Sequence, residues 1–366
     1  MKIGIITRHA IANYGSVLQS YATEKVLEKL GYNSEIIDYI REEEKSENLA
    51  KTFAKNSKFW NKNFLTRFMY KIIQTPNIKK QEKEFKINRQ KYLKMSKKQF
   101  ENFESDIPEY DIYCTGSDQV WGQIANSDYD ENYFLEFVPQ GKKCISYAAS
   151  FGKANISDEL KQKLPKLLKK YSSILVRENS AVNILKKCNI ESELVLDPTL
   201  LLDKNDWEEL YNEEYKKDEE YILVYQLHHN RDFDKYLKKL KNRIKIKIYR
   251  ISPSFYFKFL PGNCVYLPSL EEFITLFHDA KYVITDSFHG TVFSIIFNKE
   301  MLDILPKKTG TRIENILKSF DINNRILTNY NNFDVIYEKI NFLDINNKLK
   351  DERNKSINLL RKALEE

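Results

Sequence analysis

The 366-residue chain has few glycines and prolines, few cysteines and no long apolar run. Its ten glycines and nine prolines exclude collagen-like and low-complexity classes. No window offers about 18 uncharged apolar residues, so we expect no membrane-spanning helix. The hydrophobic fraction of 42% and the charged fraction of 30% are typical of a globular protein with a substantial core.

Metal and disulfide frameworks are not indicated. The four cysteines, Cys114, Cys144, Cys188 and Cys264, lie tens of residues apart without a CxxC pair, so we expect reduced core thiols. The five histidines show no HExxH or other ligand spacing. We therefore expect no metal site and no bound cofactor.

The charge balance is only mildly basic, with 59 Lys and Arg against 52 Asp and Glu and a net charge of +7. Such an excess suits anionic small substrates or an anionic membrane surface and does not require nucleic acid, which we do not expect as a partner. The N-terminal run reaches Arg8 and His9 too soon for a secretory signal. We expect a cytoplasmic protein, at most peripheral at the inner face of the membrane.

The order of predicted elements indicates an α/β fold with two Rossmann-like domains facing a cleft, a GT-B-like architecture. The length agrees with two domains of about 150 residues each. We expect an N-terminal domain over 1–200 with a helical insertion at 42–103, a second domain over 201–340 and a C-terminal helix over 341–366. The insertion has helical periodicity, with only Pro76 as a strong breaker.

The expected strands are short apolar runs without helical period. In the first domain they cover 3–7, 34–39, 110–115, 143–148, 173–176 and 193–196. In the second they cover 221–227, 245–251, 263–267, 282–285 and 301–305.

The turn after the first strand is the first candidate site. It contains Asn13, Tyr14, Gly15 and Ser16, where backbone N–H groups at a helix start suit phosphate or carboxylate. A structural alternative has Gly15 making the turn and Ser16 capping the helix. The two interpretations are compatible.

A second candidate follows the strand at 110–115, at the end where open α/β sheets bind ligands. Here Ser117, Asp118 and Trp121 stand close together in the sequence. We expect Asp118 to accept a proton from a hydroxyl and Trp121 to stack on a sugar. The alternative is a capping arrangement with Trp121 in the core.

The third candidate is Arg177, which emerges from an apolar strand. Its planar guanidinium suits a carboxylate or phosphate. A surface pair with Glu178 is the structural alternative.

The fourth candidate is the strand-to-helix turn around His289. Ser287 and the free amides of this turn suit an anion, and an imidazole titrates near neutrality. A lone histidine is usually structural, but the flanking Gly290 and Thr291 at a turn facing the presumed cleft favour a functional role.

The insertion carries a basic and aromatic run. Between 51 and 80 there are eight basic residues and no acidic one, with aromatic residues interleaved. Such a helix lies on an anionic bilayer or grips a lipid diphosphate, so peripheral membrane contact through 51–80 is one expectation. The alternative is a helix that packs its aromatics on the first domain with solvated lysines outside.

Together these segments resemble the polysaccharide pyruvyl transferase family. The matching stretches are NYGSVLQSYA, YDIYCTGSDQVW, CISYAASFG, ILVRENSA, LDPTLLL and YVITDSFHGTVFSIIF, in that order. The resemblance implies a GT-B-like fold and transfer of a pyruvyl group from phosphoenolpyruvate onto two hydroxyls of one sugar. The products are a cyclic ketal and phosphate, and the expected acceptor is a lipid- or nucleotide-linked saccharide precursor.

The resemblance also implies roles for individual residues. Arg177 and the helix start around His289 would hold the carboxylate and the phosphate of the donor. His289 would be the leading general acid, and Asp118 a base or an acceptor contact.

One departure from the family pattern lies in the last motif. Some members carry Arg-Leu-His where this chain has Ser287, Phe288 and His289, so an anion contact is missing at 287. Lys307, Lys308 and Arg312 are candidates to supply the lost charge.

Two other functions stay open at this point. A glycosyltransferase of the same architecture would use a nucleotide-sugar in the same cleft. A non-catalytic saccharide-binding protein would keep the fold and use its aromatic residues, 13% of the chain, for sugar contacts.

Overall fold

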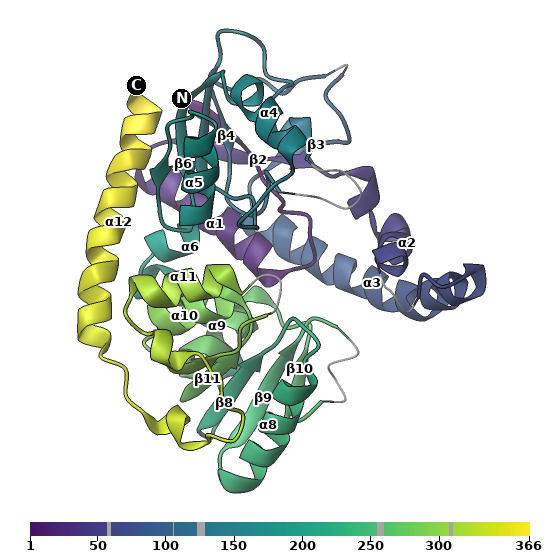
Figure 1. Ribbon diagram of the computed structural model, residues 1–366, viewed down its shortest axis with the longest axis vertical. Helices are drawn as coiled ribbons and strands as arrows, with labels where there is room; N and C mark the ends of the chain where they lie inside the picture. The colour runs from purple at the N-terminus through teal and green to yellow at the C-terminus, as the bar shows by residue number, and fades with distance from the viewer. Residues whose placement is uncertain (57–59, 105, 123–128, 255–259, 307–309) are drawn as a thin grey trace. The chain divides into compact units, whose positions relative to one another are not determined.

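The computed structural model describes residues 1–56, 60–104, 106–122, 129–254, 260–306 and 310–366. These residues form two compact units (Figure 1). Unit 1 comprises Met1–Leu201 with Asn354–Glu366, and unit 2 comprises Leu202–Arg353. Each unit is built on a parallel sheet, which confirms the α/β fold class. No helix among the residues described is long and apolar enough to cross a membrane.

The sheet of unit 1 has seven parallel strands in the order β3-β2-β1-β4-β5-β6-β7. They are β1 (Lys2–Ile6), β2 (Asn33–Tyr39), β3 (Met95–Phe100), β4 (Ile112–Thr115), β5 (Lys143–Ala149), β6 (Tyr171–Val176) and β7 (Glu193–Leu194). β1 pairs with β2 on one side and with β4 on the other, so the strand order reverses there. In such sheets ligands bind outside the carboxyl ends of the strands at this switch point.

The helices of unit 1 connect these strands. They are α1 (Tyr14–Lys29), α2 (Ser46–Asn56), α3 (Phe64–Tyr92), α4 (Asp158–Leu167), α5 (Asn179–Lys187) and α6 (Pro198–Leu201). The last turns of α12 (Phe342–Glu365) also belong to this unit. There the backbone N–H of Leu196 donates to the hydroxyl of Ser356 over 3.0 Å.

The insertion differs from its expectation as an all-helical segment. α3 continues through Pro76, which does not end it. α3 extends beyond the sheet, with α2 packed beside its outer part (Figure 1). β3 then adds a strand parallel to β2. The helical prediction was wrong here because β3 is an edge strand whose exposed, lysine-rich sequence lacks the apolar run of a central strand.

The sheet of unit 2 has five parallel strands in the order β10-β9-β8-β11-β12, with its switch point between β8 and β11. The strands are β8 (Tyr221–Tyr225), β9 (Lys247–Ser252), β10 (Asn263–Tyr266), β11 (Tyr282–Thr285) and β12 (Glu300–Asp303). The helices are α7 (Lys204–Glu208), α8 (Arg231–Arg243), α9 (Leu270–Asp279), α10 (Phe288–Ile296) and α11 (Thr311–Ser319), together with α12 up to Arg353.

The four thiols are free, as expected. Cys114 and Cys144 are buried, whereas Cys188 and Cys264 are partly exposed. Burial raises the pKa of Cys114 to about 12 and that of Cys144 to about 11. At neutral pH these two thiols stay protonated and serve as core residues.

Candidate functional site

The loops after β1 and β4 meet at the switch point of unit 1. The hydroxyl of Thr7 donates to the carbonyl oxygen of Ser117 over 2.7 Å. The hydroxyl of Ser16 donates to Oδ2 of Asp118 over 3.0 Å. Ser16 lies in the first turn of α1, so this contact joins the helix start to the β4 loop.

The start of α1 is capped by Asn13, whose side chain accepts from the N–H of Gly15 over 2.8 Å. The expectation that Ser16 is the cap was therefore wrong, because its hydroxyl is bonded to Asp118. Tyr14 is buried and packs on Phe85 of α3 with ring centroids 4.8 Å apart. This turn thus links α1 both to the loop after β4 and to α3 of the insertion.

Asp118 has an unusual backbone, with φ at 84°. Its Oδ1 accepts from the N–H of Gln119 over 2.8 Å, and its side chain is 14% exposed. Holding a residue in a sparsely populated region costs about 1–3 kcal/mol, and such residues cluster at functional sites. The backbone and the bond to Gln119 therefore hold the Asp118 carboxylate in one position in the loop after β4.

Arg177 lies in a buried network at the end of β6. Its Nη1 is 2.7 Å from Oδ2 of Asp197 and 3.3 Å from the hydroxyl of Ser117. Its Nε is 3.8 Å from Glu178, and its Nη2 is 3.9 Å from Asp118. One guanidinium therefore faces three carboxylates.

This network decides the charge state of Arg177. Burial lowers its pKa, but Asp197, Glu178 and Asp118 outweigh that effect, and the pKa is raised overall. The side chain is only 3% exposed. Arg177 is thus a permanently charged clamp that holds the loop of Ser117 and Asp118, and it does not present an open fork at the surface.

Trp121 lies in the core of unit 1 and is fully buried. Its ring stacks on Phe134 at 5.4 Å, and its N–H donates to the carbonyl oxygen of Tyr133 over 3.1 Å. No face of the indole is open to a sugar. The structure supports the core alternative for this residue, and the stacking prediction was wrong.

At the switch point of unit 2, Asp286 joins the loops after β8 and β11. Its carboxylate accepts from the backbone N–H of Leu227 over 2.6 Å and from that of His228 over 2.9 Å. The ring of His228 lies 3.2 Å from the same carboxylate. Asp286 is buried, and these bonds hold the loop from which α10 begins against the loop after β8.

α10 starts with Ser287 as its cap, whose hydroxyl accepts from the N–H of Gly290 over 3.4 Å. A Cβ added at Gly290 would lie 2.1 Å from Oγ1 of Thr285, so only glycine lets the helix approach the strand this closely. The hydroxyl of Thr291 donates to Oδ1 of Asp303 over 2.5 Å. These three predicted site residues hold the helix start in place.

His289, the second residue of α10, is 8% exposed and lies edge-on to Phe288 with ring centroids 5.2 Å apart. The guanidinium of Arg312 lies 5.7 Å from the same Phe288 ring. The Phe288 ring at this helix start thus neighbours both the imidazole of His289 and the guanidinium of Arg312. Lys307 and Lys308 lie outside the described residues.

A further titratable group, not expected from the sequence, lies behind this helix start. Asp303 ends β12 and is fully buried. Burial raises its pKa to about 7, although the Thr291 hydroxyl acts in the opposite direction. No motif marked this residue, because only the fold brings it next to α10.

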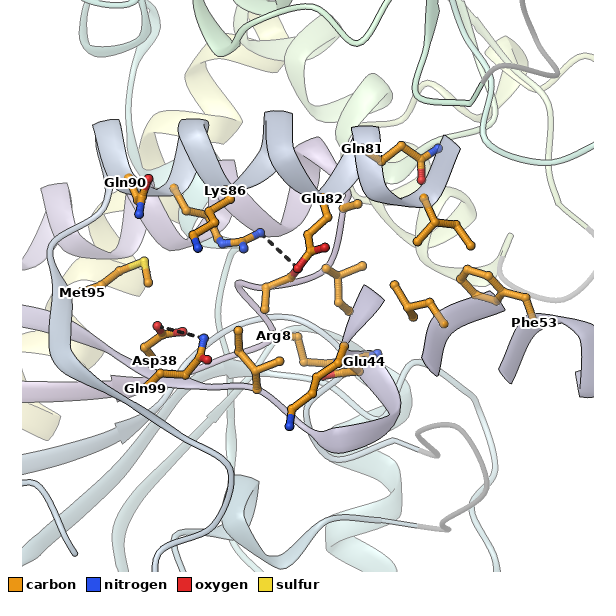
Figure 2. Close-up of a pocket in the computed structure, with 18 residues that line it drawn as sticks. Arg8, Asp38, Glu44, Phe53, Gln81, Glu82, Lys86, Gln90, Met95 and Gln99 are labelled. Atoms are coloured by element: carbon orange, nitrogen blue, oxygen red, sulfur yellow. Dashed lines mark hydrogen bonds and ion pairs between the residues drawn. The ribbon is translucent and has the colours of Figure 1, made fainter. Parts of the chain in front are cut away.

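Unit 1 also contains a cavity of about 610 Å³ between α3 and the carboxyl ends of β1 and β2. Figure 2 shows residues of α3 along one wall and Arg8, Asp38 and Gln99 opposite. Its lining comes from the loop after β1, the carboxyl end of β2, and the segments around α2, α3 and β3. Sequence reasoning missed this pocket because these segments are separate in the chain.

The predicted site residues fall into two groups, each within one unit. The first joins Ser16, Ser117, Asp118 and Arg177. The second joins Ser287, His289, Gly290, Thr291 and Arg312. Across the described part of the chain, no group of three or more His, Cys, Asp or Glu is arranged to hold a metal ion.

Comparison with solved structures finds similar folds. A UDP-N-acetylglucosamine 2-epimerase is 8% identical with a TM-score of 0.52, covering 99% of this chain and 95% of its own. The UDP-GlcNAc 2-epimerase of Methanocaldococcus jannaschii is 13% identical with a TM-score of 0.49, covering 92% and 91%. The Escherichia coli heptosyltransferase WaaC is 12% identical with a TM-score of 0.37, covering 83% and 88%. The first of these likenesses supports the GT-B-like fold and nothing further.

Comparison of the sequence with curated proteins finds no significant match. The family profile described as polysaccharide pyruvyl transferase, by contrast, matches residues 13–302. This span begins after β1 and includes the candidate residues around both switch points, except Lys307, Lys308 and Arg312. The chain therefore belongs to the polysaccharide pyruvyl transferase family and is a transferase.

Proposed function

We propose that this transferase moves a pyruvyl group from phosphoenolpyruvate onto two hydroxyls of one saccharide and releases phosphate. The observation that carries the proposal is the family match over residues 13–302. The carboxyl ends of both parallel sheets carry the polar residues that such chemistry needs.

The reaction balances without a redox partner. A proton adds to the methylene carbon of the donor, and a sugar hydroxyl forms a C–O bond to the neighbouring carbon. Phosphate then leaves with the electrons of its C–O bond, and the second hydroxyl closes the ketal. Of the two hydroxyl protons, one balances the proton added to carbon and the other leaves with phosphate or solvent.

We assign His289 as the general acid that protonates the methylene carbon. An imidazole is the side chain best suited to donate a proton near neutrality. The start of α10 and Arg312 provide positive potential for the phosphate and carboxylate of the donor. Arg312 would thus make up for the charge that Ser287 lacks.

We assign Asp118 as the base that accepts a proton from a sugar hydroxyl. Its strained backbone and its contact with Ser16 hold the carboxylate in one place. Arg177 acts as a positioning residue through Ser117 and Asp118. Direct donor binding by Arg177, the expectation from the sequence, would require the guanidinium to leave part of its carboxylate network.

The acceptor in this proposal is a lipid- or nucleotide-linked saccharide, met at the cytoplasmic face of a membrane. Support for membrane contact comes from one apolar face of α3, formed by residues that are each 47–76% exposed: Phe64, Leu65, Phe68, Met69, Ile72 and Ile73. Exposed Lys62, Arg67 and Lys71 accompany this face, and the sequence has no acidic residue from 51 to 80. An apolar face with a basic flank suits an anionic bilayer.

Phosphate release from phosphoenolpyruvate tests the function. The protein is incubated with phosphoenolpyruvate and a panel of saccharide acceptors, and separately with sugar nucleotides and the same acceptors. Acceptor-dependent phosphate release supports pyruvyl transfer. Release of nucleoside diphosphate without phosphate release would instead identify a glycosyltransferase.

A further inference from the structure

We infer that the cavity between α3 and the carboxyl ends of β1 and β2 binds the acceptor as a saccharide joined to a phosphate group. Two cations of α3, Lys86 and Arg89, would contact the phosphate. This inference rests on the proposed function, because it names the class of acceptor. We call this cavity the acceptor pocket.

Arg89 is the strongest sign that the acceptor pocket takes an anion. It lines the pocket and is only 5% exposed. Its Nη1 donates to the carbonyl oxygen of Ala10 over 3.1 Å, while its buried Nε has no hydrogen-bond partner among the described residues. The pocket carboxylates Asp38 and Glu82 act on this guanidinium electrostatically, but within the described part neither forms an ion pair with it within 4 Å. A buried cation in this state favours an anionic ligand.

Lys86 lies one turn before Arg89 on α3, so both side chains belong to the same face of the helix. It lines the pocket from an exposed position. The other arginine of the pocket, Arg8, differs because its Nη2 pairs with Glu44 over 2.7 Å. Among the described residues, the pair Lys86 and Arg89 therefore supplies positive charge that is not held in an ion pair, unlike that of Arg8.

The rest of the lining suits a saccharide. Gln81 and Gln90 lie on the α3 wall, and Gln99 lies opposite with its amide 3.3 Å from Oδ2 of Asp38 (Figure 2). Amides and carboxylates are hydrogen-bond partners for hydroxyls, and the side chain of Ile78 offers an apolar patch to sugar C–H groups. The volume of about 610 Å³ falls within the range of about 300–1,000 Å³ for ligand pockets. A three-carbon acid would leave most of it unfilled.

The acceptor pocket borders the loop that leads to the contact partner of the assigned base. Its wall includes Arg8 and Ala10 of the loop that leads from β1 to α1, where Ser16 contacts Asp118. Burial alone would lower the pKa of Arg8, but the negative charges of Glu44 and Asp118 outweigh this effect and raise the pKa overall. Asp118 is therefore near enough to act electrostatically on a residue of the pocket wall.

The position of Phe53 favours a lipid as the group attached to the phosphate. Phe53 lines the pocket from α2 and is 48% exposed. α2 packs against α3, the helix whose outer part carries the exposed apolar face. A lipid chain leaving the pocket past Phe53 would meet apolar surface, whereas a nucleotide could stack its base on Phe53 but would leave the apolar face of α3 uncovered.

The test is a binding titration by calorimetry in the absence of phosphoenolpyruvate. Glucose 1-phosphate is the probe, and glucose is its neutral counterpart. The variants are Lys86→Gln and Arg89→Gln, with Lys83→Gln as matched control, because Lys83 is an exposed lysine of α3 outside the pocket lining. Circular dichroism checks that each variant folds. If Arg89→Gln does not fold, Lys86→Gln still tests the inference, because Lys86 is exposed and its replacement should not affect folding.

We expect glucose 1-phosphate to bind about tenfold more weakly to each pocket variant, because each loses one charge-assisted hydrogen bond. Its binding to Lys83→Gln should equal that of the wild type. Equal binding by all variants, no binding at all, or phosphoenolpyruvate binding with the same dependence on Lys86 and Arg89 would overturn the inference. The titration contains no donor, so its result does not depend on whether the protein transfers a pyruvyl group.

A second pair of probes distinguishes the two phosphate-linked sources. A glucosyl phosphate with a short isoprenyl chain is compared with UDP-glucose, on the wild type and on Phe53→Ser. We expect tighter binding of the isoprenyl probe and a loss of that advantage in Phe53→Ser. Tighter binding of UDP-glucose that still depends on Lys86 and Arg89 would support the pocket and overturn the lipid assignment.

Discussion

The hydroxyl of Ser16 donates to Oδ2 of Asp118 over 3.0 Å, although 102 residues separate the two in the chain. The contact joins the first turn of α1 to the loop after β4, at the point where the strand order of unit 1 reverses. It fixes one oxygen of the carboxylate, while the N–H of Gln119 binds the other. A base that must meet a sugar hydroxyl benefits from such positioning.

Asp118→Asn tests the base directly. Asparagine keeps the size of the side chain and tolerates a positive φ, so the fold should persist. We expect turnover to fall about 100-fold or more, because a general base is lost. Phosphate release under saturating donor and acceptor measures the change.

Ser16→Ala separates positioning from chemistry at the same place. We expect a loss of roughly tenfold in turnover, smaller than that of Asp118→Asn, because the carboxylate remains but is held less firmly. Unchanged turnover in both variants would remove Asp118 from the mechanism.

His289→Gln tests the general acid. We expect turnover to fall about 100-fold or more with a smaller change in the KM for phosphoenolpyruvate, because protonation is lost while the helix start remains. The pH–rate profile should also lose the limb that depends on a protonated imidazole.

The control is His278→Gln, which changes a histidine at the end of α9, away from the α10 start. His278 contacts Asp279 and Glu208, so some loss of stability is expected without loss of turnover. Equal turnover in His289→Gln and His278→Gln would refute the assignment of His289.

Arg177→Gln should mainly destabilise the protein. The substitution leaves Asp197 and Glu178 buried without their shared cation, and breaking a buried ion pair costs about 3–5 kcal/mol. Urea unfolding measures this loss. Combining Arg177→Gln with Asp197→Asn should recover part of it, because the second change removes one uncompensated charge.

A stable Arg177→Gln variant with a strongly raised KM for phosphoenolpyruvate would point the other way. It would restore the expectation from the sequence that Arg177 contacts the donor. The free energy of unfolding and the KM are therefore measured on the same preparation.

Membrane contact predicts that the protein sediments with vesicles containing anionic lipid and not with neutral vesicles. Phe64→Ser with Phe68→Ser should weaken this binding, because both rings are exposed on the α3 face. Ile87→Ser is the matched control, since Ile87 is 48% exposed on the same helix outside that face. Salt should weaken the wild-type binding by screening the basic flank. Equal binding by all variants would exclude the α3 face.

Asp303 predicts a pH dependence of stability. Its pKa is about 7 in the folded chain and near 3.9 when unfolded, so the folded state binds more protons between these values. The free energy of unfolding therefore falls as the pH rises from about 4 to about 7 through this group. Asp303→Asn should flatten that fall and be more stable than the wild type at pH 8. An unchanged pH profile in the variant would contradict the raised pKa.

The sequence predicted most strands within a few residues because these strands are buried runs of apolar residues. β11 was expected at the bounds that the structure has. β3 was missed because an edge strand needs no apolar run. Pro76 was expected to break a helix, but α3 continues through it, with Thr75 donating to the carbonyl oxygen of Lys71 in the preceding turn.

The motifs gave the positions of site residues but not their contacts. Trp121 reads equally well as a sugar platform or a core residue, and only packing on Phe134 distinguishes the two. From the sequence, Arg177 is a candidate for binding an anion. Only the fold shows that Asp197, which follows another strand, already pairs with its guanidinium. Arg89 and Asp303 carried no signal at all, because their environments are made by segments distant in sequence.

The most direct test follows the carbon atoms of the donor. The protein is incubated with phosphoenolpyruvate carrying ¹³C in its three-carbon unit and with isoprenyl-phosphate-linked saccharides, and the acceptor is analysed by mass spectrometry and NMR. The account predicts a ketal carbon bonded to two sugar oxygens, formed in equal amount to the phosphate released. Acceptor that gains no labelled carbon across the panel, while a sugar nucleotide donates its sugar, would contradict it.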